Sequence, residues 1–384
     1  MRSIKLILIA MLPVVFFAGS TWACSICSGY QQSLSVREQA SKSNTKAIFF
    51  GIITNSTLNA DGSGKTTISL TKTLKIASEF KAPPFLTIPQ YLPCEASSFN
   101  GILLFTDFSK GGIDVVRGVP IPSKEVQEYV EGAMLASSKE GPALLDYFLP
   151  NLQSSSREIA ADAFLEFAKA SDATLLNISK KMNPALLKSW ILDPKVPEDR
   201  LGLFAFLLGG CGAEADVNFL FQLLKSPSSR AQASYDGALV ALIRLYPNKG
   251  WSALNDALRN DDTSLQLRLA CIRSIKASAE IYQNESDRTK ILNALNIALK
   301  QGELADLAIE ELRRMKRWEL TPEIISLYGT KGYNAPVMKR AFLRYALTAP
   351  NDQTIEFFLN KCREKEPQVL LEVQESLGFT QLKP

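Results

Sequence analysis

Short apolar runs and alternating polar positions characterise the chain between residues 46 and 122. Ala47–Ile53 is apolar and β-branched, and the stretch from Thr66 to Ile76 alternates between apolar and polar side chains, as half-buried strands do. Asn59–Gly64, rich in Asp, Gly and Ser, predicts a hairpin turn between them. Three later apolar runs predict three more strands, at Phe85–Ile88, Ile102–Phe105 and Ile113–Val116.

These five strands predict a small closed β-barrel of the oligonucleotide/oligosaccharide-binding (OB) type, since closure removes the exposed edges of a set of short strands. Pro120 and Pro122 mark the end of the β-rich region, and Ser123 is a suitable N-cap for a first helix. We therefore expect a β domain over residues 24–122.

The pattern changes after residue 123, where apolar residues recur at spacings of three and four, the period of amphipathic helices. Similar helices are centred on six alanines: Ala163, Ala205, Ala238, Ala270, Ala308 and Ala341. These positions differ by 42, 33, 32, 38 and 33 residues, close to the roughly 33–47 residues of helical-pair repeats. Each pair has an apolar face that only its neighbours can bury, so we expect a helical-pair array over residues 123–384. An irregular all-α domain is the alternative.

Residues 1–23 have the organisation of a secretory signal peptide. Arg2 and Lys5 precede an apolar run, Leu6–Ala18, which is shorter than the roughly 20 residues of a membrane-spanning helix. Cleavage after Ala23 would make Cys24 the first mature residue, and a lipid anchor at that cysteine is the alternative to a free terminus. No later stretch is long and uncharged enough to span a membrane, so we expect a secreted or periplasmic protein.

Composition narrows the classes of function. The chain has no histidine, which excludes Ser-His-Asp and Cys-His catalysis, HExxH zinc chemistry and histidine-ligated haem. A hydrolase that uses a pair of carboxylates remains an alternative, although no pair stands out. The formal net charge of +4 gives no domain-wide basic excess that would indicate nucleic acid. We expect a protein that is not an enzyme, has no cofactor and binds a protein or cell-envelope component; its oligomeric state stays open.

The sharpest local motif is the cysteine pair at Cys24 and Cys27. After export into an oxidising compartment, a structural disulfide is the default, and Cys94 is the remaining cysteine of the β domain. We expect Cys24 or Cys27 to bond to Cys94, with a redox or metal-binding role as the alternative. The other cysteines are far apart in apolar helical segments and predict buried thiols rather than a metal site: Cys211, Cys271 and Cys362.

The densest basic run of the chain contains Arg313, Arg314, Lys316, Arg317 and Trp318. Basic residues interleaved with an aromatic ring can bind an anionic partner. Acidic residues precede the run, however, and a helix with acids early and bases late complements its own dipole. The dipole interpretation is the simpler one, and an anionic-partner patch is the alternative.

Two resemblances extend these predictions. A leading cysteine, a small five-stranded barrel and a cysteine about 70 residues later resemble the netrin-like domain of tissue metalloproteinase inhibitors and complement proteins. In those inhibitors the first mature residue is a cysteine that approaches the target zinc, and Cys24 would correspond to it. The inhibitors have Cys-x-Cys and further disulfides, whereas this chain has Cys24-x-x-Cys27 and Cys94. The resemblance implies an inhibitor or metal-binding module as an alternative function.

The segments Ala160–Ala168 and Asp306–Arg314 look like parts of an uncharacterised family of secreted bacterial proteins with HEAT-like helices. That resemblance implies an architecture, a β domain followed by an α-solenoid, and no activity. Together with the composition, it leads us to expect an exported binding or scaffolding protein whose concave helical face engages a partner.

Overall fold

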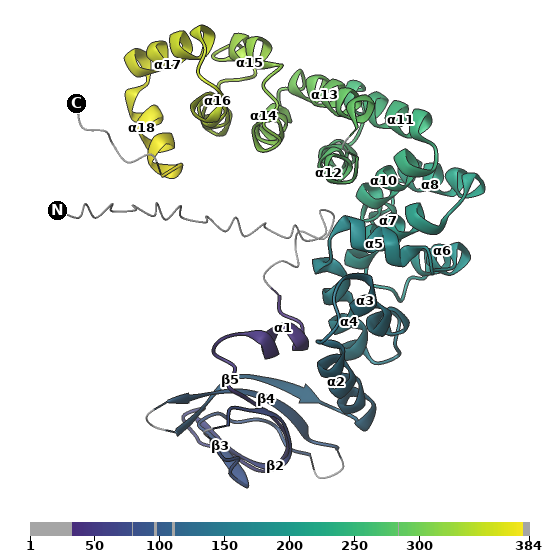
Figure 1. Cartoon of the computed structure of the whole chain (residues 1–384), viewed down its shortest axis with the longest axis vertical. Coiled ribbons are helices and arrows are strands. Elements are labelled where there is room, and N and C mark those ends of the chain that lie inside the picture. Colours follow the sequence, from purple (N-terminus) through teal and green to yellow (C-terminus); the bar gives the residue numbers. More distant parts are fainter. Residues whose placement is uncertain (1–32, 79, 96–97, 110–111, 283, 379–384) are drawn as a thin grey trace, which may run out of the picture.

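The computed structural model describes residues 33–78, 80–95, 98–109, 112–282 and 284–378. In this part of the chain a short helix, α1 (Val36–Ser41), precedes a β-sheet, and helices occupy the rest. The molecule is an arc with the sheet at one end and the last helices at the other (Figure 1). No described helix is long and apolar enough to cross a membrane.

Five antiparallel strands form one sheet in the order β3-β2-β1-β4-β5. Each includes one of the predicted segments: β1 (Ala47–Leu58), β2 (Gly64–Ile76), β3 (Phe85–Ile88), β4 (Gly101–Ser109) and β5 (Gly112–Ile121). The predicted β domain is thus a five-stranded antiparallel sheet. Among the described residues no ladder joins β3 to β5, so the hydrogen-bonded sheet has two edges.

The two faces of the sheet belong to different hydrophobic clusters. Leu103 and Phe105 of β4 join a core that continues into the first helices of the array. The alternating residues Ile102 and Leu104 face the other way, into a small separate cluster. Gly51 lies on that second face, and a Cβ there would come within 2.4 Å of the Ile68 side chain, so a glycine is needed where the sheet curls.

Helices follow without any further strand in the described residues. Ser123 caps the first of them, as predicted, by accepting a hydrogen bond from the backbone N–H of Val126. The helices are α2 (Lys124–Ala136), α3 (Gly141–Phe148), α4 (Arg157–Lys169), α5 (Asp172–Ser179), α6 (Pro184–Leu192), α7 (Leu201–Cys211), α8 (Val217–Lys225), α9 (Ser229–Gln232), α10 (Tyr235–Leu245), α11 (Pro247–Arg259), α12 (Leu265–Ile281), α13 (Glu285–Leu299), α14 (Ala305–Arg314), α15 (Thr321–Leu327), α16 (Pro336–Thr348), α17 (Gln353–Lys365) and α18 (Pro367–Ser376).

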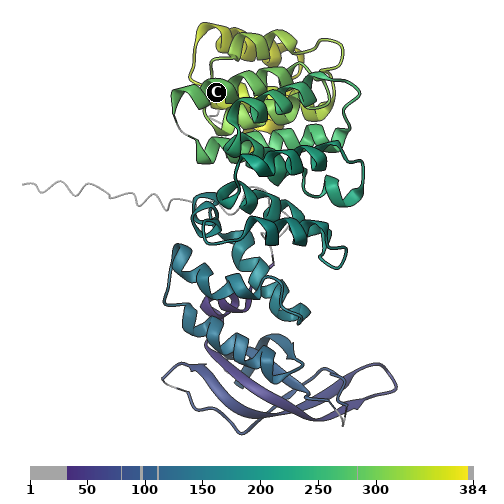
Figure 2. The same cartoon turned by 90° about the vertical axis from the view of Figure 1, so that its right-hand side faces the viewer.

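The helices of the far half of the arc lie in two layers. In Figure 1, α12, α14 and α16 line the inner side, and α11, α13, α15 and α17 the outer side; Figure 2 shows these helices stacked above the sheet. The six alanines that predicted helix centres fall in α4, α7, α10, α12, α14 and α16, and none is more than 1% exposed. Successive helices from α7 to α16 in this series pack on one another, so each buries its apolar face on its neighbours.

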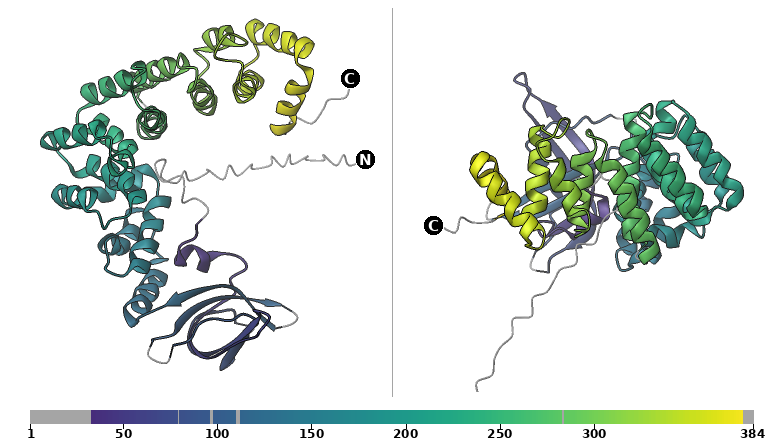
Figure 3. Two further views of the ribbon diagram at one scale, coloured as in Figure 1. Left: turned by 180° about the vertical axis from the view of Figure 1, so that it is seen from behind. Right: turned by 90° about the horizontal axis from the view of Figure 1, so that it is seen from above.

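Helices α7 and α10 pack more closely than side chains normally allow. A Cβ on Gly237 would lie 1.9 Å from the carbonyl oxygen of Gly202, and one on Gly209 would lie 2.7 Å from Cα of Ala241. Backbone therefore meets backbone at this crossing. The right panel of Figure 3 shows the helical array from above.

Helix α1 comes before the sheet in the sequence but binds helix α4 beyond it. The Ser35 hydroxyl donates to Glu166 at 2.5 Å, and the Arg37 guanidinium donates to the same carboxylate at 2.7 Å. The backbone N–H of Val36 donates to Asp162 at 2.7 Å. We call these five residues the α1–α4 clamp, because they hold the start of the β domain against the helical array.

Candidate functional site

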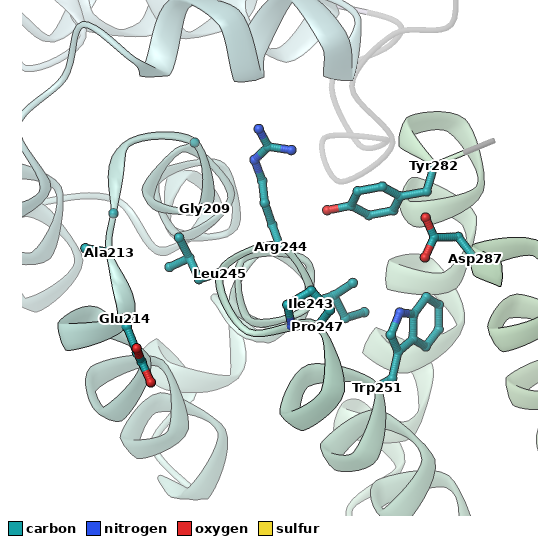
Figure 4. Close-up of a pocket in the computed structure, with 12 residues that line it drawn as sticks. Gly209, Ala213, Glu214, Ile243, Arg244, Leu245, Pro247, Trp251, Tyr282 and Asp287 are labelled. Carbon is teal, nitrogen blue, oxygen red and sulfur yellow. The ribbon is translucent and has the colours of Figure 1, made fainter. Parts of the chain in front are cut away.

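Two adjoining hollows lie where helices of the array turn. The first, of about 530 Å³, is lined by the C-terminal ends of α7 and α10 and the start of α11 (Figure 4). The second, of about 490 Å³, is lined by α12, α13 and the turn after α14. Tyr282, the C-cap of α12, lines both hollows and joins them. We call the pair the turn-edge groove.

Three glycines form one wall of the first hollow for reasons of packing. A Cβ on Gly209 would meet the α10 backbone, and one on Gly210 would lie 1.7 Å from the Ser179 hydroxyl. A Cβ on Gly212 would lie 2.7 Å from the carbonyl oxygen of Leu208. The glycines therefore let α7 end tightly against its neighbours, and they leave a wall of backbone beside the groove.

Arg244 is the central charge of the first hollow. It stands in the last turn of α10, and its guanidinium extends toward the hydroxyl of Tyr282 (Figure 4). Arg244 forms no ion pair with a described carboxylate. The Tyr282 hydroxyl is buried and has no partner with hydrogen-bond geometry. Burial is the largest influence and raises the pKa of Tyr282, Arg244 opposes the shift and Asp287 adds to it, so the hydroxyl is a neutral donor.

The second hollow is lined by three cations and no acidic residue. Arg288 forms an ion pair with Glu285 at 3.9 Å, and Arg317 forms one with Glu319 at 2.8 Å. Neither acid lines the hollow. Lys316 forms no ion pair with a described residue. The Nε of Arg317 is buried and has no hydrogen-bond acceptor. This hollow therefore holds positive charge and an unused donor.

The backbone at Lys316 is strained in a way that places these side chains. Its φ is +54°, a region that favours glycine, and the N–H of Arg317 closes the helix by donating to Leu312 O at 2.8 Å. A lysine at this position costs stability relative to glycine. The cost is explained if the charge of Lys316 is used in the groove.

The predicted basic run is divided by the structure. Arg313 pairs with Glu310 at 2.6 Å and Arg314 with Glu311 at 3.1 Å, both within α14. The Trp318 ring packs edge-on against Tyr345, with centroids 5.0 Å apart. The remaining two residues of the run, Lys316 and Arg317, reach the groove. The other groove residues, Arg244, Tyr282 and Arg288, did not stand out in the sequence.

Charges between the inner helices are already paired. Asp236 of α10 accepts two hydrogen bonds from Arg273 of α12, at 2.5 and 2.8 Å. Glu310 of α14 accepts from Arg344 of α16 at 3.4 Å. These ion pairs link successive helices, whereas Arg244 and Lys316 of the turn edge form no ion pair with a described carboxylate.

Carboxylates with raised pKa values occur elsewhere in the array. Burial, reinforced by Asp172, raises the pKa of Glu280 to about 7, and burial also raises the pKa of Glu311. Lys276 opposes both shifts. None of these residues lines the turn-edge groove. The acids that do line the groove, Glu214 and Asp287 of the first hollow, are not among these carboxylates.

The cysteine predictions fall partly outside the described residues, since Cys24 and Cys27 lie there. Cys94 is exposed, its Sγ lies 3.5 Å from the carbonyl oxygen of Ile53, and it forms no disulfide with any described residue. Its pairing with Cys24 or Cys27 stays a prediction. Cys271 and Cys362 are buried thiols as predicted, while Cys211 is half-buried. Within the described ranges no cluster of His, Cys, Asp or Glu could hold a metal ion.

Comparison with models of protein families, with curated proteins and with solved structures finds no match to this chain. The chemistry of the groove therefore follows from its own side chains. Two cations without an ion-pair partner among the described residues, Arg244 and Lys316, and two buried donors without acceptors, on Tyr282 and Arg317, suit an anionic ligand.

Proposed function

We propose that this protein is a non-catalytic binding protein that acts after export and holds an acidic segment of a partner protein in the turn-edge groove. One observation carries the proposal: the second hollow is lined by three cations and no acid. Arg244 extends this charge into the first hollow, which also has two acids. Glu214 points away from Arg244 (Figure 4), and Asp287 is already paired with Lys290 at 3.6 Å and accepts a hydrogen bond from Asn284 at 2.6 Å.

Ligand carboxylates would supply acceptors for buried hydrogen-bond donors that have none in the free protein. A buried donor without an acceptor costs about 1–3 kcal/mol, and the groove has two of them, on Tyr282 and Arg317. A carboxylate oxygen at either position would form a charge-assisted or short hydrogen bond. The groove would therefore gain stability on binding, with a contribution that decreases as salt screens the cations.

The length of the groove favours a segment with several acidic side chains. Its hollows, of about 530 and 490 Å³, meet at Tyr282 and extend along the turns of consecutive helical pairs. A single carboxylate would satisfy one donor and leave the rest of the positive lining open. Two or more acids spaced along an extended peptide would match Arg244 at one end and Lys316 at the other.

We further infer an OB-type barrel, opened between β3 and β5, and a HEAT-like solenoid. The curled five-stranded sheet and the six buried alanines in successive helices support this architecture. Export rests on the signal-peptide pattern of residues 1–23. An array of this kind offers extended surface for recognition and suits a binding protein.

Charge reversal in the groove tests the proposal. The double variant Arg244→Glu/Lys316→Glu is compared with Lys331→Glu, which changes an exposed lysine in the turn after α15. The probe is a fluorescein-labelled decaglutamate peptide, followed by anisotropy at 50 and 200 mM salt. We expect the double variant to lose at least about tenfold in affinity, because each close ion pair is worth about 1.5 kcal/mol or more. Lys331→Glu should bind as the parent does.

Equal binding of decaglutamate by the parent protein and the double variant would contradict the proposal, as would no binding at all or equal binding of decalysine. Circular dichroism spectra of all three proteins establish that the changes leave the helices intact. Affinity purification with the same variants then identifies the partner, which should be recovered with the Lys331→Glu protein and lost with the double variant.

A further inference from the structure

A third hollow, of about 450 Å³, lies on the curled side of the β-sheet. The connection from β3 to β4 and the inner face of β5 form its walls. The lining is largely branched aliphatic, from Ile53, Ile88, Leu92, Ile102, Leu104 and Val115. Its volume is within the roughly 300–1,000 Å³ of small-molecule pockets.

The sequence of β5 creates this space. Gly118 lies opposite Leu104, and Pro120 lies opposite Ile102, so this part of the strand presents little side-chain volume to the inner face. A Cβ on Gly118 would already lie 3.3 Å from the Ile102 side chain. No residue of β5 before Ile121 is buried, whereas Gly101–Thr106 of the adjacent β4 are all buried. Val115 packs against the small cluster that includes Ile102 and Leu104, and the rest of the inner face of β5, at Gly118 and Pro120, is exposed.

The chemistry of the lining defines the occupant. None of the lining residues carries a charge, and Gln90, Ser98 and Asn100 supply the polar side chains. The Ser98 hydroxyl and the Asn100 carboxamide are already bonded to Glu95. A charged or strongly polar group would lose its hydration inside without gaining partners. An aliphatic chain has no such hydration to lose, and burying each of its methylene groups is favourable by about 0.8 kcal/mol.

We propose that this hollow, which we call the sheet pocket, binds the acyl chain of a single-chain amphiphile, with the polar head group left in solvent. The proposal goes beyond the binding of an acidic segment, because it uses a different domain and uncharged walls. It also accounts for the open side of the sheet, since a chain lying along β5 would cover the part of the inner face, at Gly118 and Pro120, that the protein leaves exposed.

The test uses the mature protein and a fluorescent fatty acid, 11-(dansylamino)undecanoic acid, whose emission increases in apolar surroundings. Val115 lines the pocket, whereas its neighbour Val116 is 40% exposed, so Val115→Phe fills the pocket and Val116→Phe is the matched control. We expect saturable binding by the parent protein and by Val116→Phe, and at least a tenfold loss for Val115→Phe. Gly118→Leu, which fills the same space from another position, should repeat the loss.

Competition defines the ligand class. Dodecanoate and dodecanol should both displace the probe, because the chain and not the head group enters the pocket, and butyrate should not. Equal probe affinity in Val115→Phe, Gly118→Leu and the parent protein, with all three folded by circular dichroism, would overturn the proposal. So would displacement by dodecanoate alone, which would show recognition of the carboxylate, or self-association of the parent protein that Val115→Phe abolishes, which would show that a second copy covers the face.

Discussion

Asp162 of the α1–α4 clamp gives the protein a pH-dependent stability that one substitution isolates. Its carboxylate accepts hydrogen bonds from Val36 N at 2.7 Å and from the Tyr129 hydroxyl at 2.9 Å. Burial is the largest influence and raises its pKa from 3.8 to about 6. The neighbouring carboxylate of Glu166 raises the pKa further, while the two hydrogen bonds and Arg117 oppose the shift. Asp162→Asn keeps the size of the side chain and removes the titration.

The sign of the effect follows from the direction of the shift. The pKa of Asp162 is higher in the folded protein than its ordinary value of 3.8, so the folded state binds the proton more tightly. The stability that this group contributes is complete below about pH 4 and is lost as the pH rises through 6. A shift of about two pKa units, at 1.36 kcal/mol each, corresponds to a loss of about 3 kcal/mol.

The assay is urea unfolding followed by circular dichroism, from pH 4 to pH 7.5, for the parent protein and Asp162→Asn. The free energy of unfolding of the variant minus that of the parent should rise by about 3 kcal/mol across this range. The difference removes the contribution of groups that both proteins share, such as Glu310. Burial acts to raise the pKa of Glu310, but Arg313, Arg344 and Arg314 together lower it below its ordinary value, so the stability that this group contributes is lost in acid. Asp61 lies in an exposed turn with a lowered pKa, so Asp61→Asn should not reproduce the rise. A difference that is constant with pH would refute the reasoning.

Four further substitutions test the packing and the clamp by urea unfolding. Gly237→Ala should lower the free energy of unfolding by about 2–3 kcal/mol, because the new methyl group meets backbone. Gly118→Ala should lower it much less, because its methyl group meets only side-chain atoms at 3.3 Å or beyond. Equal losses would contradict the close helix crossing. Arg37→Ala should cost about 2–4 kcal/mol by leaving the buried carboxylate of Glu166 without its cation, and a neutral result would mean that water replaces the arginine. Tyr345→Phe should cost about 1 kcal/mol through its lost hydroxyl bonds, and an unchanged midpoint would show that those bonds contribute nothing.

The spacing of apolar residues predicted the strands and helices because it shows which side of each element is buried. Ser123 caps α2 as expected from its position after Pro122. Each strand segment was found, although β1 and β5 extend beyond the apolar runs that predicted them. Those extensions consist mainly of exposed residues, so they lack the alternation of apolar and polar positions from which a strand can be predicted. Sequence periodicity therefore locates the buried part of an element better than its ends.

Pairings across long separations were not predictable in the same way. Ser35 meets Glu166 across 131 residues, and neither residue differs locally from an ordinary helix cap or surface acid. The groove has the same character, since Arg244, Tyr282 and Lys316 come together only when helices of different lengths stack. One signal was present, since Lys316 and Arg317 belong to the basic run of the sequence. Nothing in the sequence indicated that Arg244 or Tyr282 would lie beside them.

Because α1 is held by α4, the sheet is topologically an insertion between two parts of one helical unit. The polypeptide enters and leaves it at points that are anchored on the same side, so the sheet cannot swing freely on a single linker. A cut in the connection between β2 and β3 would leave two fragments that stay associated. During synthesis the clamp must wait for residues more than 120 positions downstream, so it can form only after α4 has been made.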